Sequence, residues 1–176
     1  MNKLFGRGIF RGVDLVLPKY SLIYMPRDPL KNMRSFLNRD KNFWLDNNRP
    51  EDACNEFRLD SSEMEKGELY LWMWTELHLR FQTMCKSPKV EAFSTLRTEH
   101  MNDVKSWEKT LCELRLPFSD ISIEPPSNSN AKLGFGATRV TEEDVDLFQR
   151  FLTRLPADVR KRVDYFDAYE PTLSIG

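Results

Sequence analysis

The sequence has few of the residues that build common catalytic and metal sites. Its 176 residues include two histidines, three cysteines and seven glycines. Cys54, Cys85 and Cys112 lie far apart, and no CxxC pair occurs. An odd number of isolated cysteines argues against a disulfide framework and a structural zinc site, and it is typical of a reducing compartment. We therefore expect free thiols and an intracellular, cytoplasmic protein.

Long apolar runs are also missing. A helix that spans a bilayer needs about 20 consecutive apolar residues, and no such run is present. The first twenty residues, "MNKLFGRGIFRGVDLVLPKY", carry positive charge but have neither a continuous apolar region nor a small-residue cleavage site. The sequence thus predicts neither a transmembrane segment nor a signal peptide.

The sequence contains none of the short motifs that commonly mark catalytic and cofactor sites. The patterns GxxxxGK[ST], GxSxG and HExxH do not occur. The glycines of "GRGIFRG" do not follow an expected strand, as a phosphate-binding loop would require. His78 and His100 are too few to form a typical metal site without further ligands. We expect no metal ion and no small-molecule cofactor.

Charge is nearly balanced in total but unevenly distributed. The net charge is −1, yet residues 1–41 hold nine Lys and Arg against three Asp. Residues 42–76 hold three Lys and Arg against nine acidic residues. Either these blocks neutralise each other across the folded surface, or the basic end faces an anionic partner. For the second alternative, the candidate binding residues are Lys3, Arg7 and Arg11, and the partner is a nucleic acid or an anionic membrane surface.

The first twelve residues, "MNKLFGRGIFRG", combine basic and apolar side chains with three glycines. Glycine disfavours a helix, so we expect a flexible basic arm over residues 1–12 and one domain over residues 13–176. A basic arm with apolar side chains suits an anionic lipid surface or RNA. The alternative is an ordinary disordered chain end.

Residues 68–82, "ELYLWMWTELHLRFQ", alternate between two kinds of side chain. A two-residue period is typical of a strand and differs from the 3.6-residue period of a helix. We therefore predict a long central strand here. One of its faces is apolar. The other carries aromatic and then charged side chains: Tyr70, Trp72, Trp74, Glu76, His78 and Arg80.

The remaining pattern predicts a single α+β domain: a mainly antiparallel sheet around residues 68–82, with three to five helices packed on it. Proline and glycine positions, alternation and helical spacing divide the chain into elements. The expected further strands are residues 13–18, 21–26, 89–97, 120–124 and 131–140, and the expected helices are residues 29–38, 98–116, 141–155 and 156–166.

Two interpretations remain open for Tyr70, Trp72 and Trp74. If helices cover both faces of the sheet, the three rings belong to the core. If one face is open, they form a ladder that stacks on the bases of single-stranded nucleic acid or anchors a protein partner. The acidic run before them favours a protein partner or a second copy of the chain.

Glu76, His78 and Arg80 would lie in a row on the same strand face. A carboxylate, an imidazole and a guanidinium in a row can hold a phosphate or transfer protons. The alternative is a solvated charged face, which is common at strand ends. No catalytic residue is assigned from this pattern alone.

Together these features favour a non-catalytic interaction or assembly protein of the adaptor or viral accessory type. Its basic arm would contact an anionic partner, and its aromatic face a protein partner or another copy. One alternative is a specific inhibitor or toxin-neutralising protein that uses the acidic residues 46–68 and the aromatic face. Another is a small hydrolase or transferase that uses Glu76, His78 and Arg80.

Overall fold

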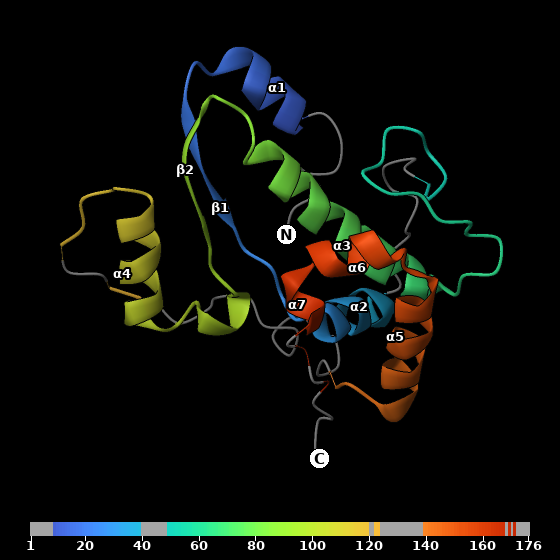
Figure 1. Cartoon of the computed structure of the whole chain (residues 1–176). Coiled ribbons are helices and arrows are strands. Elements are labelled where there is room, and N and C mark those ends of the chain that lie inside the picture. The colour runs from blue at the N-terminus through green and yellow to red at the C-terminus, as the bar shows by residue number, and fades with distance from the viewer. Residues whose placement is uncertain are drawn as a thin grey trace. The chain divides into compact units, whose positions relative to one another are not determined.

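The computed structural model describes residues 9–39, 49–119, 122–123, 139–167, 169 and 171, with the backbone alone for residues 9–11 and 167. These residues form seven α-helices, one 3₁₀ turn and two strands (Figure 1). The chain divides into two compact units, which are described separately. Unit 1 comprises Met1–Asp28 and Phe81–Ser127, and unit 2 comprises Pro29–Arg80 and Asn128–Gly176.

Unit 1 is built around a two-stranded parallel sheet. Strands β1 (Tyr20–Tyr24) and β2 (Val90–Thr95) pair side by side in the same direction (Figure 1). Parallel strands need a long crossover between them, and here most of the connecting chain belongs to unit 2. Helix α1 precedes β1, and β2 is followed by the 3₁₀ turn and α4; these elements span Ile9–Val16, Thr98–His100 and Val104–Glu113.

Unit 2 is helical in its described residues. Helix α3 runs over Lys66–Met84, and its part up to Arg80 belongs to this unit. The other four helices are α2 (Pro29–Asn38), α5 (Glu142–Arg154), α6 (Ala157–Arg162) and α7 (Asp164–Asp167). Figure 1 shows them gathered around α3.

Local sequence signals account for how α2 and α5 begin and dock. Pro29 starts α2, a position where its missing N–H costs no hydrogen bond. Thr141 caps α5 in a capping box with Asp144. The Asp144 carboxylate also accepts a hydrogen bond from Arg34 Nε at 2.9 Å, and so ties α5 to α2. Asp144 thus takes part both in the cap of α5 and in the contact of α5 with α2.

The expected central strand is wrong, because residues 66–84 form helix α3. Helix α3 is buried on nearly every side and therefore lacks the polar stripe that marks a helix in a sequence, so the alternation of its side chains dominated the pattern. Leu69 and Leu71 from one set are buried, and so are Tyr70 and Trp72 from the other. The mainly antiparallel sheet built on that strand is wrong for the same reason. The mixed helix-and-strand composition is confirmed.

The strand expected over residues 13–18 is also wrong, because α1 extends to Val16. Helix α1 starts within the arm expected over residues 1–12 and includes Gly12. Contacts of Asp14, described below, hold it against the sheet and offset the low helix propensity of glycine. Residues 1–8 lie outside the described residues, and the proposed division into an arm and one domain stays a prediction.

Several other elements are confirmed. Helix α2 has the expected bounds, β1 begins one residue earlier and ends two residues earlier than expected, and β2, α4 and α5 are shorter than expected. The expected single helix over residues 156–166 is divided into α6 and α7. Val163 lies between those two helices and is buried. The hairpin expected over residues 120–140 lies mostly outside the described residues.

Replacing Trp72 by alanine tests the burial of α3. Trp72 is 1 % exposed, and its ring centroid lies 6.1 Å from that of Phe57. The variant is expected to lose about 3–5 kcal/mol of unfolding free energy in urea titrations, because it leaves a large cavity. Phe118→Ala is the control, since Phe118 is 45 % exposed, and it should lose less than about 1 kcal/mol. Equal losses in the two variants would contradict the helical core.

Candidate functional site

The three aromatic residues expected on an open sheet face lie in the core of unit 2. Tyr70, Trp72 and Trp74 are 1 %, 1 % and 4 % exposed. Tyr70 stacks on Phe36 of α2 at 5.2 Å between centroids, and Trp74 meets Tyr165 of α7 edge-on at 5.3 Å. The core interpretation, which the sequence left open, is the one that the structure supports. No sheet face presents these rings to a nucleic acid or a protein.

Glu76 and Arg80 lie one turn apart on α3 and form a buried ion pair, with Arg80 Nε donating to Glu76 Oε1 at 2.6 Å. The Glu76 carboxylate also accepts two backbone N–H groups. The Glu56 nitrogen lies 3.0 Å from Oε1 and 3.1 Å from Oε2 of Glu76, and the Phe57 nitrogen lies 3.3 Å from Oε2. Both oxygens are therefore engaged, and Glu76 is only 2 % exposed.

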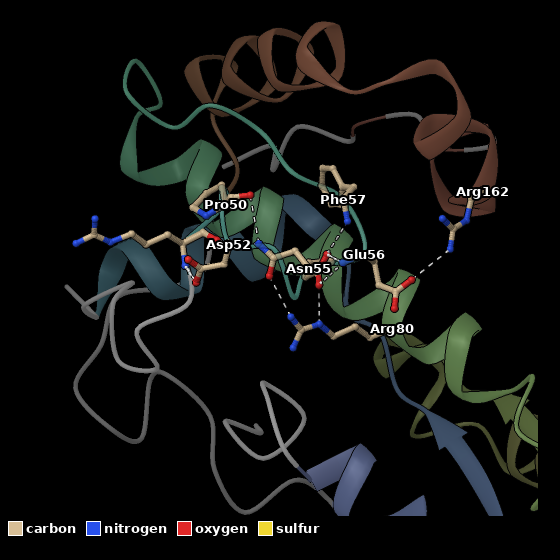
Figure 2. A network of polar contacts seen from close by, with 9 residues as sticks. Pro50, Asp52, Asn55, Glu56, Phe57, Arg80 and Arg162 are labelled. Carbon is tan, nitrogen blue, oxygen red and sulfur yellow. Dashed lines mark hydrogen bonds and ion pairs between the residues drawn. The ribbon is translucent and has the colours of Figure 1, made fainter.

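This pair extends into a network that holds the segment before α3 (Figure 2). Arg80 Nη2 donates to Asn55 Oδ1 at 3.2 Å, and Asn55 Nδ2 donates to the Pro50 carbonyl at 3.2 Å. Arg162 of α6 lies 3.8 Å from the Glu56 carboxylate. Residues 49–60 contain neither a helix nor a strand, so side chains supply acceptors for some of their backbone groups. The geometry fits a fixed structural support.

His78 does not join Glu76 and Arg80 in a row, so that expectation is wrong. On a helix, two residues later means about 200° further around the axis. His78 instead stacks on Trp74, with ring centroids 5.7 Å apart. Burial lowers the pKa of His78, and the negative charge of Asp164 partly opposes this shift. The imidazole is therefore neutral at neutral pH and contributes to packing.

Glu76→Gln tests the structural role of the network. The substitution removes the charge that balances the buried Arg80, so we expect a loss of about 3–5 kcal/mol in unfolding free energy. Glu65→Gln is a matched control, because Glu65 pairs with Arg150 at 2.5 Å on the surface. An exposed pair contributes less than about 1 kcal/mol, and the control should unfold almost as the parent does in urea. Equal stability of the two variants would contradict the assigned role.

His78 predicts a dependence of stability on pH. Because its folded pKa is lowered, the unfolded chain binds a proton more readily, and the unfolding free energy should fall as the pH drops below about 6.5. His78→Gln should flatten urea-unfolding stability between about pH 7 and about pH 5 relative to the parent. His100→Gln is the control, because it removes the exposed histidine and leaves His78 in place. An unchanged slope in His78→Gln would refute the assignment.

Cys85 is a poor candidate for a nucleophile. Burial raises the pKa of Cys85 to about 11, so its reactive thiolate is scarce at neutral pH. Cys54 and Cys112 are exposed and form no disulfide. Across the part of the chain that the structure describes, no group of three or more His, Cys, Asp or Glu side chains is placed to hold a metal ion.

The N-terminal end offers a different kind of surface. Lys3 and Arg7 lie outside the described residues, and Arg11 is placed in α1 by its backbone alone. The next charged residue, Asp14, is turned toward the rest of unit 1. Its Oδ1 accepts hydrogen bonds from Tyr20 Oη at 2.8 Å and from Ser87 Oγ at 2.6 Å. These two hydroxyls lower the pKa of Asp14, so it stays ionised at neutral pH.

Asp14 has a third contact, because Lys89 Nζ donates to its backbone carbonyl. A cation near the last turn of α1 also suits the helix dipole. We call this set of four residues the α1 anchor: Asp14, Tyr20, Ser87 and Lys89. The α1 anchor joins α1 to the start of β1 and to the turn before β2.

Immediately after Asp14, the chain exposes aliphatic side chains. Leu15 is 82 % exposed, Val16 79 % and Leu17 41 %. The sequence pattern did not reveal this surface, because residues 13–18 were expected to form a strand. The signal that could have found it is a short apolar run beside basic residues. Within the described ranges, all exposed large hydrophobic residues belong to unit 1: Leu15, Val16, Leu17, Ile23, Phe93, Val104, Leu116 and Phe118.

No family model, curated protein or solved structure matches this chain. Among the helices in the described ranges, none combines the length and apolar character that crossing a bilayer requires.

Proposed function

We propose that this chain is a non-catalytic interaction protein that binds an anionic partner through its N-terminal end. The observation that carries the proposal is the position of Asp14, the sole acidic residue among residues 1–19. The same stretch contains four basic residues, Lys3, Arg7, Arg11 and Lys19. Because Asp14 is turned toward Tyr20 and Ser87, no acidic side chain of this stretch opposes the cations at the surface.

Lys19 is the one of these four cations whose side-chain contact is described, and it pairs with Glu91 at 2.9 Å. Both side chains are largely exposed, so solvent screens the pair and an anionic partner can compete for Lys19. Lys3, Arg7 and Arg11 come before Asp14 and extend the basic character toward the chain end. An electrostatic contact of this kind weakens as salt concentration rises.

The two alternative functions have less support. An inhibitor that uses the aromatic face would need Tyr70, Trp72 and Trp74 at a surface, whereas they contact α2, α7 and the segment before α3. A hydrolase or transferase built on residues 76–80 would need its three side chains to converge. Instead, the Glu76 oxygens accept backbone and Arg80 hydrogen bonds, and His78 stacks on Trp74.

The triple variant Lys3→Gln, Arg7→Gln, Arg11→Gln tests the proposal. Each basic residue near an anionic lipid surface contributes about 1 kcal/mol, so the triple variant should bind about a hundredfold more weakly. The probes are single-stranded RNA and vesicles of equal parts phosphatidylglycerol and phosphatidylcholine, each titrated with the full chain at low and high salt. Binding of at least one probe by the parent, lost at high salt and in the variant, is the expected result.

Lys105→Gln, Lys109→Gln, Arg115→Gln is the matched control, since it removes three cations from α4 and the residues after it. This control should bind as the parent does. If the parent binds neither probe at low salt, or if both triple variants bind equally well, the N-terminal contact is refuted.

A further inference from the structure

We infer that the anionic partner is a lipid surface, and that α1 lies in the interface with its outward apolar face among the lipids. This inference rests on the proposed function, and it specifies the chemistry of the partner. Cations would meet the anionic headgroups, while Leu15, Val16 and Leu17 would enter the boundary between headgroups and acyl chains.

The α1 anchor fixes which face of the helix points outward. Successive residues of a helix are about 100° apart, so Val16 lies about 200° around the axis from Asp14. Asp14 contacts Ser87 and Tyr20, and the opposite side of the helix therefore faces away from these contacts. The exposures of Leu15 and Val16, 82 % and 79 %, agree with this orientation.

Gly12 gives an independent indication that this face is open. It lies one turn before Val16, on the side of α1 away from Asp14. A Cβ atom added to Gly12 would meet no described atom within 4 Å. The outward face of α1 therefore has room along a full turn, from Gly12 to Val16.

The combination of side chains favours lipid over nucleic acid. A nucleic-acid backbone is bound by cations and hydrogen-bond donors, and bases are commonly stacked on aromatic rings. The described outward residues, Leu15, Val16 and Leu17, have neither donors nor rings. Aliphatic side chains beside cations instead match an anionic bilayer surface, which offers charge at the headgroups and hydrocarbon just beneath them.

The length of the apolar stretch indicates reversible attachment. Helix α1 has eight residues, too few to cross a bilayer, for which about 20 are needed. Three exposed aliphatic residues bury little area compared with a lipid anchor, so the cations and the aliphatics each contribute to attachment. Removing either set alone should therefore weaken binding measurably.

The test is co-sedimentation of full-length variants with vesicles of equal parts phosphatidylglycerol and phosphatidylcholine. Leu15→Ser with Val16→Ser should bind at least about tenfold more weakly, because the apolar area that enters the bilayer is lost. Gly12→Leu should bind about tenfold more tightly, because it adds an apolar side chain to the same open face. Val104→Ser is the matched control, since Val104 is 40 % exposed on α4, and it should bind as the parent does.

Three outcomes separate this inference from the proposed function. Weaker binding by the double serine variant, with tighter binding by Gly12→Leu, supports insertion of α1. If neither differs from the parent while Lys3→Gln, Arg7→Gln, Arg11→Gln still loses binding to an anionic probe, the lipid inference is overturned and the proposed function stands. If that triple variant also binds like the parent, the proposed function itself fails. Circular dichroism of each variant checks that its fold is retained.

Discussion

Burial of α3 on nearly every side is the constraint on which unit 2 depends. A helix in this position must present apolar side chains all around its axis, and every polar side chain on it needs a partner. Glu68 and Glu76 show how this is met. The Glu68 carboxylate accepts from the Glu65 backbone N–H and from Arg154 Nε, both at 2.9 Å. Glu76 accepts from Arg80 and from the backbone of residues 56–57.

These two carboxylates also hold neighbouring parts of unit 2 in place. Arg154 belongs to α5, so the Glu68 pair ties α5 to α3. The Glu76 network holds residues 49–60, which have no strand or helix of their own (Figure 2). A buried acceptor can thus order an irregular segment whose backbone would otherwise lack partners. Glu68 and Glu76, whose charge suggests a surface position in the sequence, thus connect buried parts of the fold.

The two units differ in what they expose. None of the exposed large apolar side chains among the described residues belongs to unit 2, whereas several belong to unit 1. A two-stranded sheet cannot cover much apolar surface by itself. Val16 remains outside because Asp14 is held on the opposite side of α1, and Leu15, about 100° around the axis from Asp14, is exposed as well. We therefore place the proposed contact with a partner on unit 1.

Much of the local structure could be predicted from the sequence. Pro29 and Thr141 mark helix starts by local chemistry, and β1 and β2 follow short apolar runs bounded by proline and turn residues. Helix α3 could not be predicted from its period, because a helix that is buried on nearly every side shows no single apolar stripe at helical spacing.

The candidate site was predictable in part. The excess of cations near the N-terminus was visible in the sequence, and the direction of Asp14 was not. That direction depends on Ser87, which is 73 residues away along the chain. The separation of His78 from Glu76 and Arg80 could not be predicted either, because it follows from the helix that the alternation concealed.

The most direct test of the proposed insertion of α1 is to measure how deeply residue 15 enters the bilayer of a vesicle. A nitroxide would be attached to Leu15→Cys, and in a second protein to Val104→Cys, with the three native cysteines replaced by serine. Oxygen concentrates in the bilayer. When the protein is added to vesicles of phosphatidylglycerol and phosphatidylcholine, we therefore expect collisions between oxygen and the nitroxide to increase at residue 15 and to stay unchanged at residue 104. An unchanged collision rate at residue 15, with the protein bound to the vesicles, would contradict the proposed insertion.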